Sequence, residues 1–185
     1  MTTRSRLVVV GLALLLLASF SNPGQRDANV PEPWCDDWAL LMLEAQSVPS
    51  AQMIPCLEIL PLGWSAEPAR IDHEGTSFVL NSSLAGEEAV TVDFLEQCDV
   101  EGAIQVRSDI NGADRYEWVE EIVSGFSGRR TYIFDGGCTV FTFDFGVDAM
   151  AALVGEVSLA VGFVPREAIN EAVRTVTDGR EQLDP

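Results

Sequence analysis

The sequence predicts an α+β domain, with an antiparallel sheet of about five to six strands, an N-terminal helix and two C-terminal helices packed on one face of the sheet. Apolar and polar residues alternate in several segments between residues 76 and 145, which is typical of an antiparallel sheet with one face on a core. Two segments with helical spacing of apolar residues follow. A run of strands followed by a run of helices indicates α+β rather than α/β.

Residues 1–21 are predicted to be an export signal, either cleaved or retained as an anchor. Two arginines precede an apolar run at residues 7–20, as in a signal peptide. A helix over this run would be about 21 Å long, whereas a bilayer core is ~30 Å thick. The small residue Ser21 also permits cleavage after it. In both cases the remaining chain is expected outside the cytoplasm, with residues 22–33 as a linker.

Residues 34–185 are predicted to form a single domain that begins with a helix over residues 35–46. Apolar residues recur there at helical spacing, and Asp36 and Asp37 suit the positive end of the helix. Residues 49–64 carry three prolines and are predicted to be extended.

Strand patterns then follow one another along the chain. The strands are predicted over residues 76–81, 89–96, 103–107, 115–119, 130–134 and 139–145. The last two are joined by Asp135-Gly136-Gly137, a strong hairpin turn signal. Alternation in the last strand places three phenylalanines on one face, Phe141, Phe143 and Phe145.

The first C-terminal helix is predicted to begin at Asp148 and to end before Gly162, and the second to run from Pro165 to Gly179. Their apolar stripes are Met150, Leu153, Val154, Val157 and Val161 in the first helix, and Ile169, Ala172, Val173 and Val176 in the second. Because no other long apolar surface is evident, both helices are expected to cover the phenylalanine face.

Four cysteines form an even set in a chain predicted to be exported, which favours disulfides. Of the three possible pairings, we favour Cys35–Cys56, which staples the N-terminal helix to the next segment, and Cys98–Cys138, which joins two strand ends. A zinc site is disfavoured because no two cysteines are close in sequence and the chain has one histidine.

Part of the chain resembles an uncharacterised family of exported or singly membrane-anchored actinobacterial proteins. The resemblance rests on Ser47-Val48-Pro49-Ser50-Ala51, Ile54-Pro55-Cys56-Leu57, Leu60-Pro61-Leu62-Gly63-Trp64, Cys98-Asp99 and Phe134-Asp135-Gly136-Gly137-Cys138-Thr139. These cysteines, prolines and glycines are structural markers, so the resemblance implies no catalytic residues.

The chain is strongly acidic, with a formal charge of −18. This charge argues against nucleic acid and anionic lipid surfaces as partners and is compatible with a cationic partner. Contact with a membrane is expected only through residues 7–20, if the signal is not cleaved. All eleven basic residues are arginine, which excludes Schiff-base and Walker-type lysines and favours a high-GC bacterium as the source.

The candidate catalytic residues each have a structural alternative. His73 is the single imidazole, so any Ser–His–Asp triad would need it, but no GxSxG motif accompanies it and a surface loop is the simpler interpretation. Paired carboxylates for glycoside hydrolysis carry no specificity among 29 acidic residues. Residues 109–114 combine oxygen ligands with a glycine but miss the EF-hand register, which leaves weak calcium binding and a simple turn open.

Two further clusters were considered as binding sites. Four arginines either form an anion pocket or pair with carboxylates across strands: Arg107, Arg115, Arg129 and Arg130. Three tryptophans near the first predicted disulfide either form an exposed platform for sugars or lipids or belong to the core: Trp34, Trp38 and Trp64.

From these observations we expect an exported cell-envelope or extracellular domain with a non-catalytic binding or structural role, and no cofactor or metal. Two alternatives stay open. One is a carboxylate-dependent hydrolase of envelope material, and the other is a carrier of a lipid or small ligand in a pocket between the sheet and the C-terminal helices.

Overall fold

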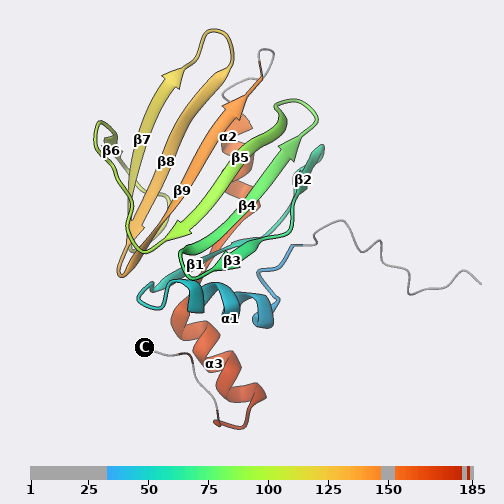
Figure 1. Cartoon of the computed structure of the whole chain (residues 1–185), viewed down its shortest axis with the longest axis vertical. Helices are drawn as coiled ribbons and strands as arrows, with labels where there is room; N and C mark the ends of the chain where they lie inside the picture. The colour runs from blue at the N-terminus through green and yellow to red at the C-terminus, as the bar shows by residue number, and fades with distance from the viewer. Residues whose placement is uncertain (1–32, 147–152, 181–182, 184–185) are drawn as a thin grey trace, which may run out of the picture.

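The computed structural model describes residues 33–146, 153–180 and 183 (Figure 1). The helices in this part of the chain are α1 (Trp38–Ser47), α2 (Leu153–Ala160) and α3 (Arg166–Val176). The strands are β1 (Met53–Leu57), β2 (Trp64–Ala66), β3 (Arg70–Asp72), β4 (Gly75–Ser82), β5 (Gly86–Leu95), β6 (Ile104–Val106), β7 (Ala113–Glu121), β8 (Phe126–Phe134), β9 (Gly137–Phe145) and β10 (Val161–Pro165). The predicted α+β class is confirmed.

Eight strands form one antiparallel sheet in the order β2-β4-β5-β9-β8-β7-β6, with β3 also paired to β4. All six predicted strands are present, but the prediction of five to six strands was too low. The two additional strands of this sheet, β2 and β3, have three residues each. That is too short for an alternating pattern to be recognised in the sequence.

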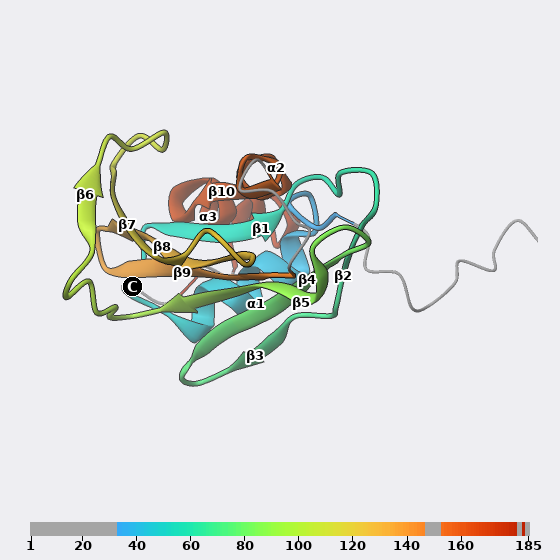
Figure 2. The ribbon, with the colours of Figure 1, turned by 90° about the horizontal axis from the view of Figure 1, so that it is seen from above.

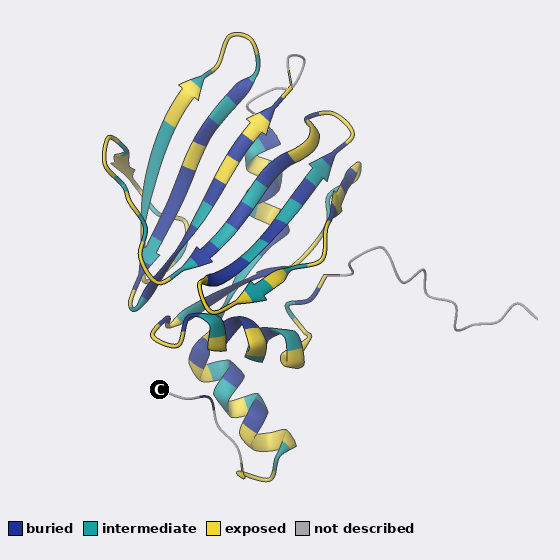
Figure 3. Ribbon diagram, viewed as in Figure 1, coloured by how far each residue is buried: buried dark blue, intermediate teal, exposed yellow. Residues whose placement is uncertain are grey.

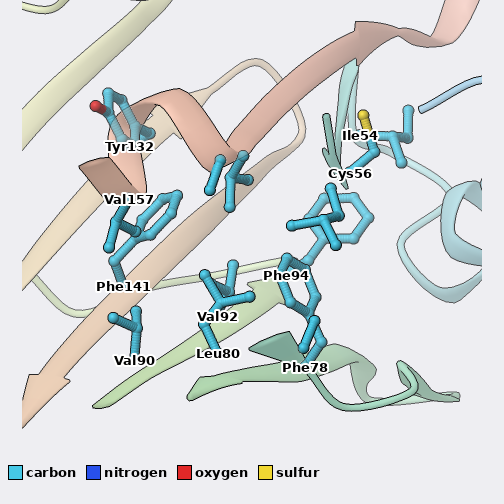
Figure 4. Close-up of a cluster of buried hydrophobic side chains, with 14 of the residues drawn as sticks. Ile54, Cys56, Phe78, Leu80, Val90, Val92, Phe94, Tyr132, Phe141 and Val157 are labelled. Atoms are coloured by element: carbon cyan, nitrogen blue, oxygen red, sulfur yellow. The ribbon is translucent and has the colours of Figure 1, made fainter. Parts of the chain in front are cut away.

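One face of the large sheet lies against the core, and we call it the inner face. Alternate residues of β4, β5 and β9 point into it and are buried (Figure 3). Figure 4 shows several of these side chains together: Phe78, Leu80, Val90, Val92, Phe94 and Phe141. The opposite, outer face carries partly exposed residues such as Thr91 and Thr142, as expected of an antiparallel sheet with one face in water.

The prediction that both C-terminal helices pack on the phenylalanine face is wrong for α3. Helix α2 does cover this face, with Val157 beside Phe141 (Figure 4). Helix α3 instead packs against α1 and β10, beyond the lower end of the sheet in Figure 1.

A second small sheet takes the place predicted for α3. The chain passes from α2 directly into β10, which pairs antiparallel with β1, and this pair lies on the same side of the large sheet as α2 (Figure 2). Phe163 of β10 contacts the rings of Tyr132 and Phe134 at centroid distances of 5.5 and 6.1 Å. The pairing of β1 with β10 could not be recognised in the sequence, because Pro55 interrupts the strand pattern of β1 and because β10 continues the apolar stripe of α2.

For the first C-terminal helix, the predicted start at Asp148 and the predicted stripe residue Met150 lie outside the described residues.

Helix α1 begins at Trp38, three residues later than predicted, because Asp37 is its N-cap. The Oδ1 atom of Asp37 accepts hydrogen bonds from the backbone N–H groups of Ala39 and Leu40, both at 3.1 Å.

Both predicted disulfides are confirmed. Cys35 pairs with Cys56, with Cα atoms 5.1 Å apart, and Cys98 pairs with Cys138, with Cα atoms 6.1 Å apart. The first ties the segment before α1 to β1, and the second ties the segment after β5 to β9. Closing loops with sequence separations of 21 and 40 is worth about 3–4 kcal/mol each in the chain-entropy description.

The predicted export signal and all but the last residue of the predicted linker lie outside the described residues. No helix within residues 33–146 and 153–180 has both the length and the apolar composition needed to cross a membrane.

We expect Leu153→Ala to destabilise the domain by about 2–3 kcal/mol, because Leu153 is 7% exposed in the core and truncation of a buried leucine leaves a cavity. Leu159, on the same helix, is 69% exposed, so Leu159→Ala is the matched control and should change stability by less than about 0.5 kcal/mol. Urea unfolding of the oxidised domain measures both. Equal losses for the two variants would contradict the packing of α2 on the inner face.

Candidate functional site

The layer over the inner face ends at β8, and the inner face is open at β6 and at Val119 of β7. The register pairs Ile104 with Glu117 and Val106 with Arg115, so the side chains of these β6 residues share the inner face with those of β7. Ile104 is 71% exposed and Val106 37%, whereas the inward residues of β5 and β9 are buried. Figure 2 shows β6 at the far end of the curved sheet, away from α2.

Exposed apolar side chains gather along this part of the sheet. Twelve large apolar side chains of the described residues are exposed, and five of them fall within residues 104–123: Ile104, Val106, Val119, Ile122 and Val123. We call Ile104–Val106 together with residues 118–123 the β6–β7 edge. Concentration of apolar surface in one place is a property of interaction sites, whereas single exposed apolar residues are ordinary.

Backbone pairing is incomplete along the same edge. Strand β6 is the last strand of the sheet, and its pairing with β7 ends at Glu117, so β7 continues beyond β6 from Trp118 to Glu121 without a neighbour on that side among the described strands. Proteins usually protect such edges with charges, prolines or bulges, and this stretch of β7 carries the exposed Glu120 and a bulge between Val119 and Glu121.

The opposite end of the sheet has this protection, but β6 lacks it. At that end β3 carries Arg70 and Asp72, and Pro61 and Pro68 lie on either side of β2. Strand β6 reads Ile-Gln-Val and has neither a charge nor a proline. It is therefore the less protected edge of the sheet.

The tip of the β7–β8 hairpin is held by one carboxylate. Glu121 Oε1 accepts hydrogen bonds from the backbone N–H groups of Ile122 and Val123 at 2.8 and 2.6 Å, with Ser124 at 3.4 Å. These bonds lower the pKa of Glu121. The turn thereby presents Ile122 and Val123 to solvent in a defined conformation.

A network of charges lies on the inner face where the open edge meets the core. Glu117 Oε1 accepts from Arg115 Nε at 2.8 Å and from Arg130 Nε at 2.7 Å, and Arg130 also donates to the Ser158 hydroxyl of α2. The hydroxyl of Tyr132 donates to Asp109 Oδ1 at 2.8 Å. These bonds fix β7 to β8, and β8 to α2.

Burial and charge act together on the groups of this network. Burial disfavours ionisation of Asp109, but the hydrogen bond from Tyr132 and the charge of Arg115 outweigh it and lower the pKa of Asp109. Burial raises the pKa of Tyr132 to about 12, against the charge of Arg130. Arg115 and Arg130 thus face the carboxylates of Asp109 and Glu117, so the network is balanced in charge. It holds β7, β8 and α2 in position relative to one another.

The four arginines considered above do not form an anion pocket. Arg130 of β8 pairs with Glu117 of β7, as the cross-strand alternative predicted, whereas Arg115 pairs with Glu117 on its own strand. Arg129 lies on the outer face, with its guanidinium carbon 5.0 Å from the ring centroid of Trp118, and Arg107 is exposed beyond the end of β6.

The other candidate residues are dispersed. His73 is exposed in the turn between β3 and β4. Residues 109–112 lie in the loop before β7, and residues 113 and 114 begin that strand. Asp109 is already engaged by Tyr132 and Arg115. Within the described ranges, no group of three or more His, Cys, Asp or Glu side chains is arranged to hold a metal ion.

Two of the three tryptophans belong to the core. Trp34 and Trp64 are buried, and Trp34 packs edge-on against Phe78 with the two ring centroids 5.0 Å apart. Trp38 is 39% exposed and lines a surface cleft of about 380 Å³ beside the Cys35–Cys56 disulfide. The tryptophans therefore do not form a shared exposed platform.

We expect His73→Ala to leave the fold and any binding activity unchanged, because no described side chain hydrogen-bonds to the imidazole and the turn is exposed. Stability should change by less than about 0.5 kcal/mol, measured by thermal unfolding. Loss of function with a native circular dichroism spectrum would contradict a non-catalytic role.

Sequence reasoning did not single out the β6–β7 edge. Residues 103–107 were recognised as a short apolar strand, and the acidic surroundings of this strand were available as a further signal. The sequence does not show that the layer over the inner face ends at β8, because this depends on where α2 and the β1–β10 pair lie.

Comparison with protein-family models finds no match, and neither the curated proteins nor the solved structures include one with significant similarity to this chain.

Proposed function

We propose that this chain is an exported domain that acts at or outside the cell envelope by binding a partner polypeptide, without catalysis, through the β6–β7 edge. The observation that carries the proposal is the coincidence of five exposed apolar side chains with an unpaired sheet edge. Each feature alone is unfavourable in water, and a partner would cover both.

Two disulfides support an extracellular location. All four cysteines are paired, and none of them is free. Such pairs persist in oxidising compartments and are rare in the cytosol. Together with the predicted signal at residues 1–21, they favour a protein secreted or anchored on the outer face of the plasma membrane.

The placement of the acidic groups favours binding over hydrolysis. A general acid needs a raised pKa and access to substrate. Among the described carboxyl groups with a clear pKa shift, only that of Glu44 is raised, and its side chain is 0% exposed beneath α1. A substrate cannot reach it without opening of the fold.

The proposal is tested by cosedimentation of the purified domain with the envelope fraction of its source organism. The edge variant carries Ile104→Ser, Val119→Ser and Val123→Ser, and the matched control carries Leu43→Ser, Leu159→Ser and Val176→Ser, which are also exposed apolar positions. We expect the wild type and the control to sediment and the edge variant to lose at least tenfold in affinity. Absence of binding by the wild type would refute the function, and equal loss in both variants would refute the site.

A further inference from the structure

We infer that the partner contributes an extended segment with basic side chains, which adds as a strand to the free edge of β6, within the β6–β7 edge. This inference rests on the proposed function and specifies the chemistry of the partner and its mode of binding.

The exposed edge favours a strand as the binding element. All three residues of β6 are exposed (Figure 3), and β6 pairs with no described strand on the side away from β7. An extended peptide can satisfy such backbone groups with main-chain hydrogen bonds, whereas a helix or a flat protein surface cannot.

The direction of the side chains specifies an alternating pattern. Ile104 and Val106 point to the inner face and are exposed there. In a strand added beside them, every second residue lies on the same face and would be apolar. The intervening residues would lie on the outer face, which faces solvent.

The charge around the edge specifies a basic segment. Residues 96–123 contain eight acidic residues and two arginines, a formal charge of −6. Glu101, before β6, and Glu120, on β7, are both exposed, and the register places them at the same end of β6. Of the two arginines, Arg115 is paired with Asp109 and Glu117. Complementary charge steers association and rejects partners of the same sign.

A second copy of this chain is the less favourable occupant. Each copy carries a formal charge of −18, with a local excess of acids at the edge. Edge-to-edge pairing would bring two such regions together, where like charges repel. A basic partner experiences the opposite effect.

The inference is tested with synthetic octapeptides and the oxidised domain. The probe alternates valine and arginine, and the controls are a valine–glutamate peptide and a valine–arginine peptide N-methylated at alternate residues along one edge. We expect the probe to bind at least tenfold more tightly than either control at low salt, and to weaken as salt increases. Amide hydrogen exchange should slow within Ile104–Val106.

Charge variants of the domain provide a second measurement that leaves the fold intact. Glu101→Gln with Glu120→Gln should weaken binding of the valine–arginine peptide about three- to tenfold. Glu87→Gln with Glu171→Gln, at exposed positions outside residues 96–123, should leave it unchanged.

Equal binding of the valine–glutamate peptide, undiminished binding of the N-methylated peptide, or exchange protection elsewhere would overturn the inference. Formation of a dimer through the same edge would assign it to a second copy and also overturn it. If the peptides fail while the edge variant still abolishes envelope cosedimentation, strand addition is refuted and the proposed function stands. If cosedimentation is also absent, both are refuted.

Discussion

Glu44→Gln is expected to stabilise the domain by about 3 kcal/mol at pH 7. Glu44 lies on the buried side of α1 and is 0% exposed. Neither of its carboxylate oxygens makes a hydrogen bond with another described group, and the Trp34 indole N–H is buried nearby without the geometry of a hydrogen bond. Burial raises the pKa of Glu44 from 4.5 to about 8, and the proximity of Trp34 only partly opposes this shift.

The pH dependence follows from the direction of this shift. Between pH 4.5 and about 8 the folded protein holds a proton on Glu44 that the unfolded chain releases, so the free energy of unfolding falls as pH rises through this range. One pH unit corresponds to about 1.4 kcal/mol. The contribution is fully present below pH 4.5, and about 3 kcal/mol of it is lost by pH 7.

Urea unfolding of the oxidised domain between pH 4 and pH 8 measures this effect. The difference in unfolding free energy between Glu44→Gln and the wild type should be small at pH 4 and should grow steadily to pH 8. Glu171→Gln, an exposed position on α3, is the control and should show no such trend. A pH-independent difference for Glu44→Gln would mean that the carboxyl group is ionised in the folded protein.

Glu44 also illustrates what helical spacing could and could not predict. Helical spacing predicts a buried stripe of Trp38, Leu41, Met42 and Ala45. Trp38 is 39% exposed and Met42 is half-buried, and the buried residues of α1 are Leu41, Glu44 and Ala45. The buried face is rotated because it also takes Val48, at i+4 from Glu44. An acidic residue is rarely assigned to a core from pattern alone.

The sheet could be predicted where each strand has one buried and one open face. In β5, the buried residues alternate with partly exposed ones: Val90, Val92 and Phe94. They lie opposite the last strand of the predicted hairpin, so the alternation in the sequence matches the observed pairing. The β1–β10 pair could not be predicted in the same way. Four of the five β1 residues are buried, which removes the alternation.

The open edge depends on distances between elements that no local pattern encodes. The apolar side chains of β6 would be core residues if the β1–β10 pair extended over them, and the sequence of β6 would be the same in both cases.

The disulfides were predictable because export and an even count restrict four cysteines to three pairings. For this reason the scaffold could be inferred from sequence, whereas the interaction surface required the structure.

Arg166→Met is expected to destabilise the domain by about 3–5 kcal/mol. Arg166 begins α3, is 5% exposed, and donates from Nε to the carbonyl of Ala51 at 2.6 Å and from Nη2 to the carbonyl of Val48 at 2.8 Å and that of Ala45. Two of these carbonyls lie at the C-terminal end of α1, where backbone acceptors have no partner within the helix.

The Arg166 side chain thereby joins α3 to α1, and its hydrogen bond to Ala45 spans 121 positions of the sequence. The two helices contact each other beyond the lower end of the large sheet in Figure 1. Methionine fills a similar volume but leaves three carbonyl groups buried without this donor, and each charge-assisted bond is worth about 1.5–3 kcal/mol. Burial lowers the pKa of Arg166, so part of the gain is offset by desolvation and the expected loss is smaller than the sum of the bonds.

Urea unfolding at pH 7 distinguishes this role from a simple surface effect. Arg70→Met, at an exposed position of β3, should change the free energy of unfolding by less than about 0.5 kcal/mol. Arg166→Lys keeps the charge but lacks the planar fork that reaches three acceptors, so it should recover less than half of the loss. Full recovery by lysine would show that charge alone holds α3 to α1. An unchanged midpoint in Arg166→Met would show that the apolar contacts of Ile169 and Val173 are sufficient to dock α3.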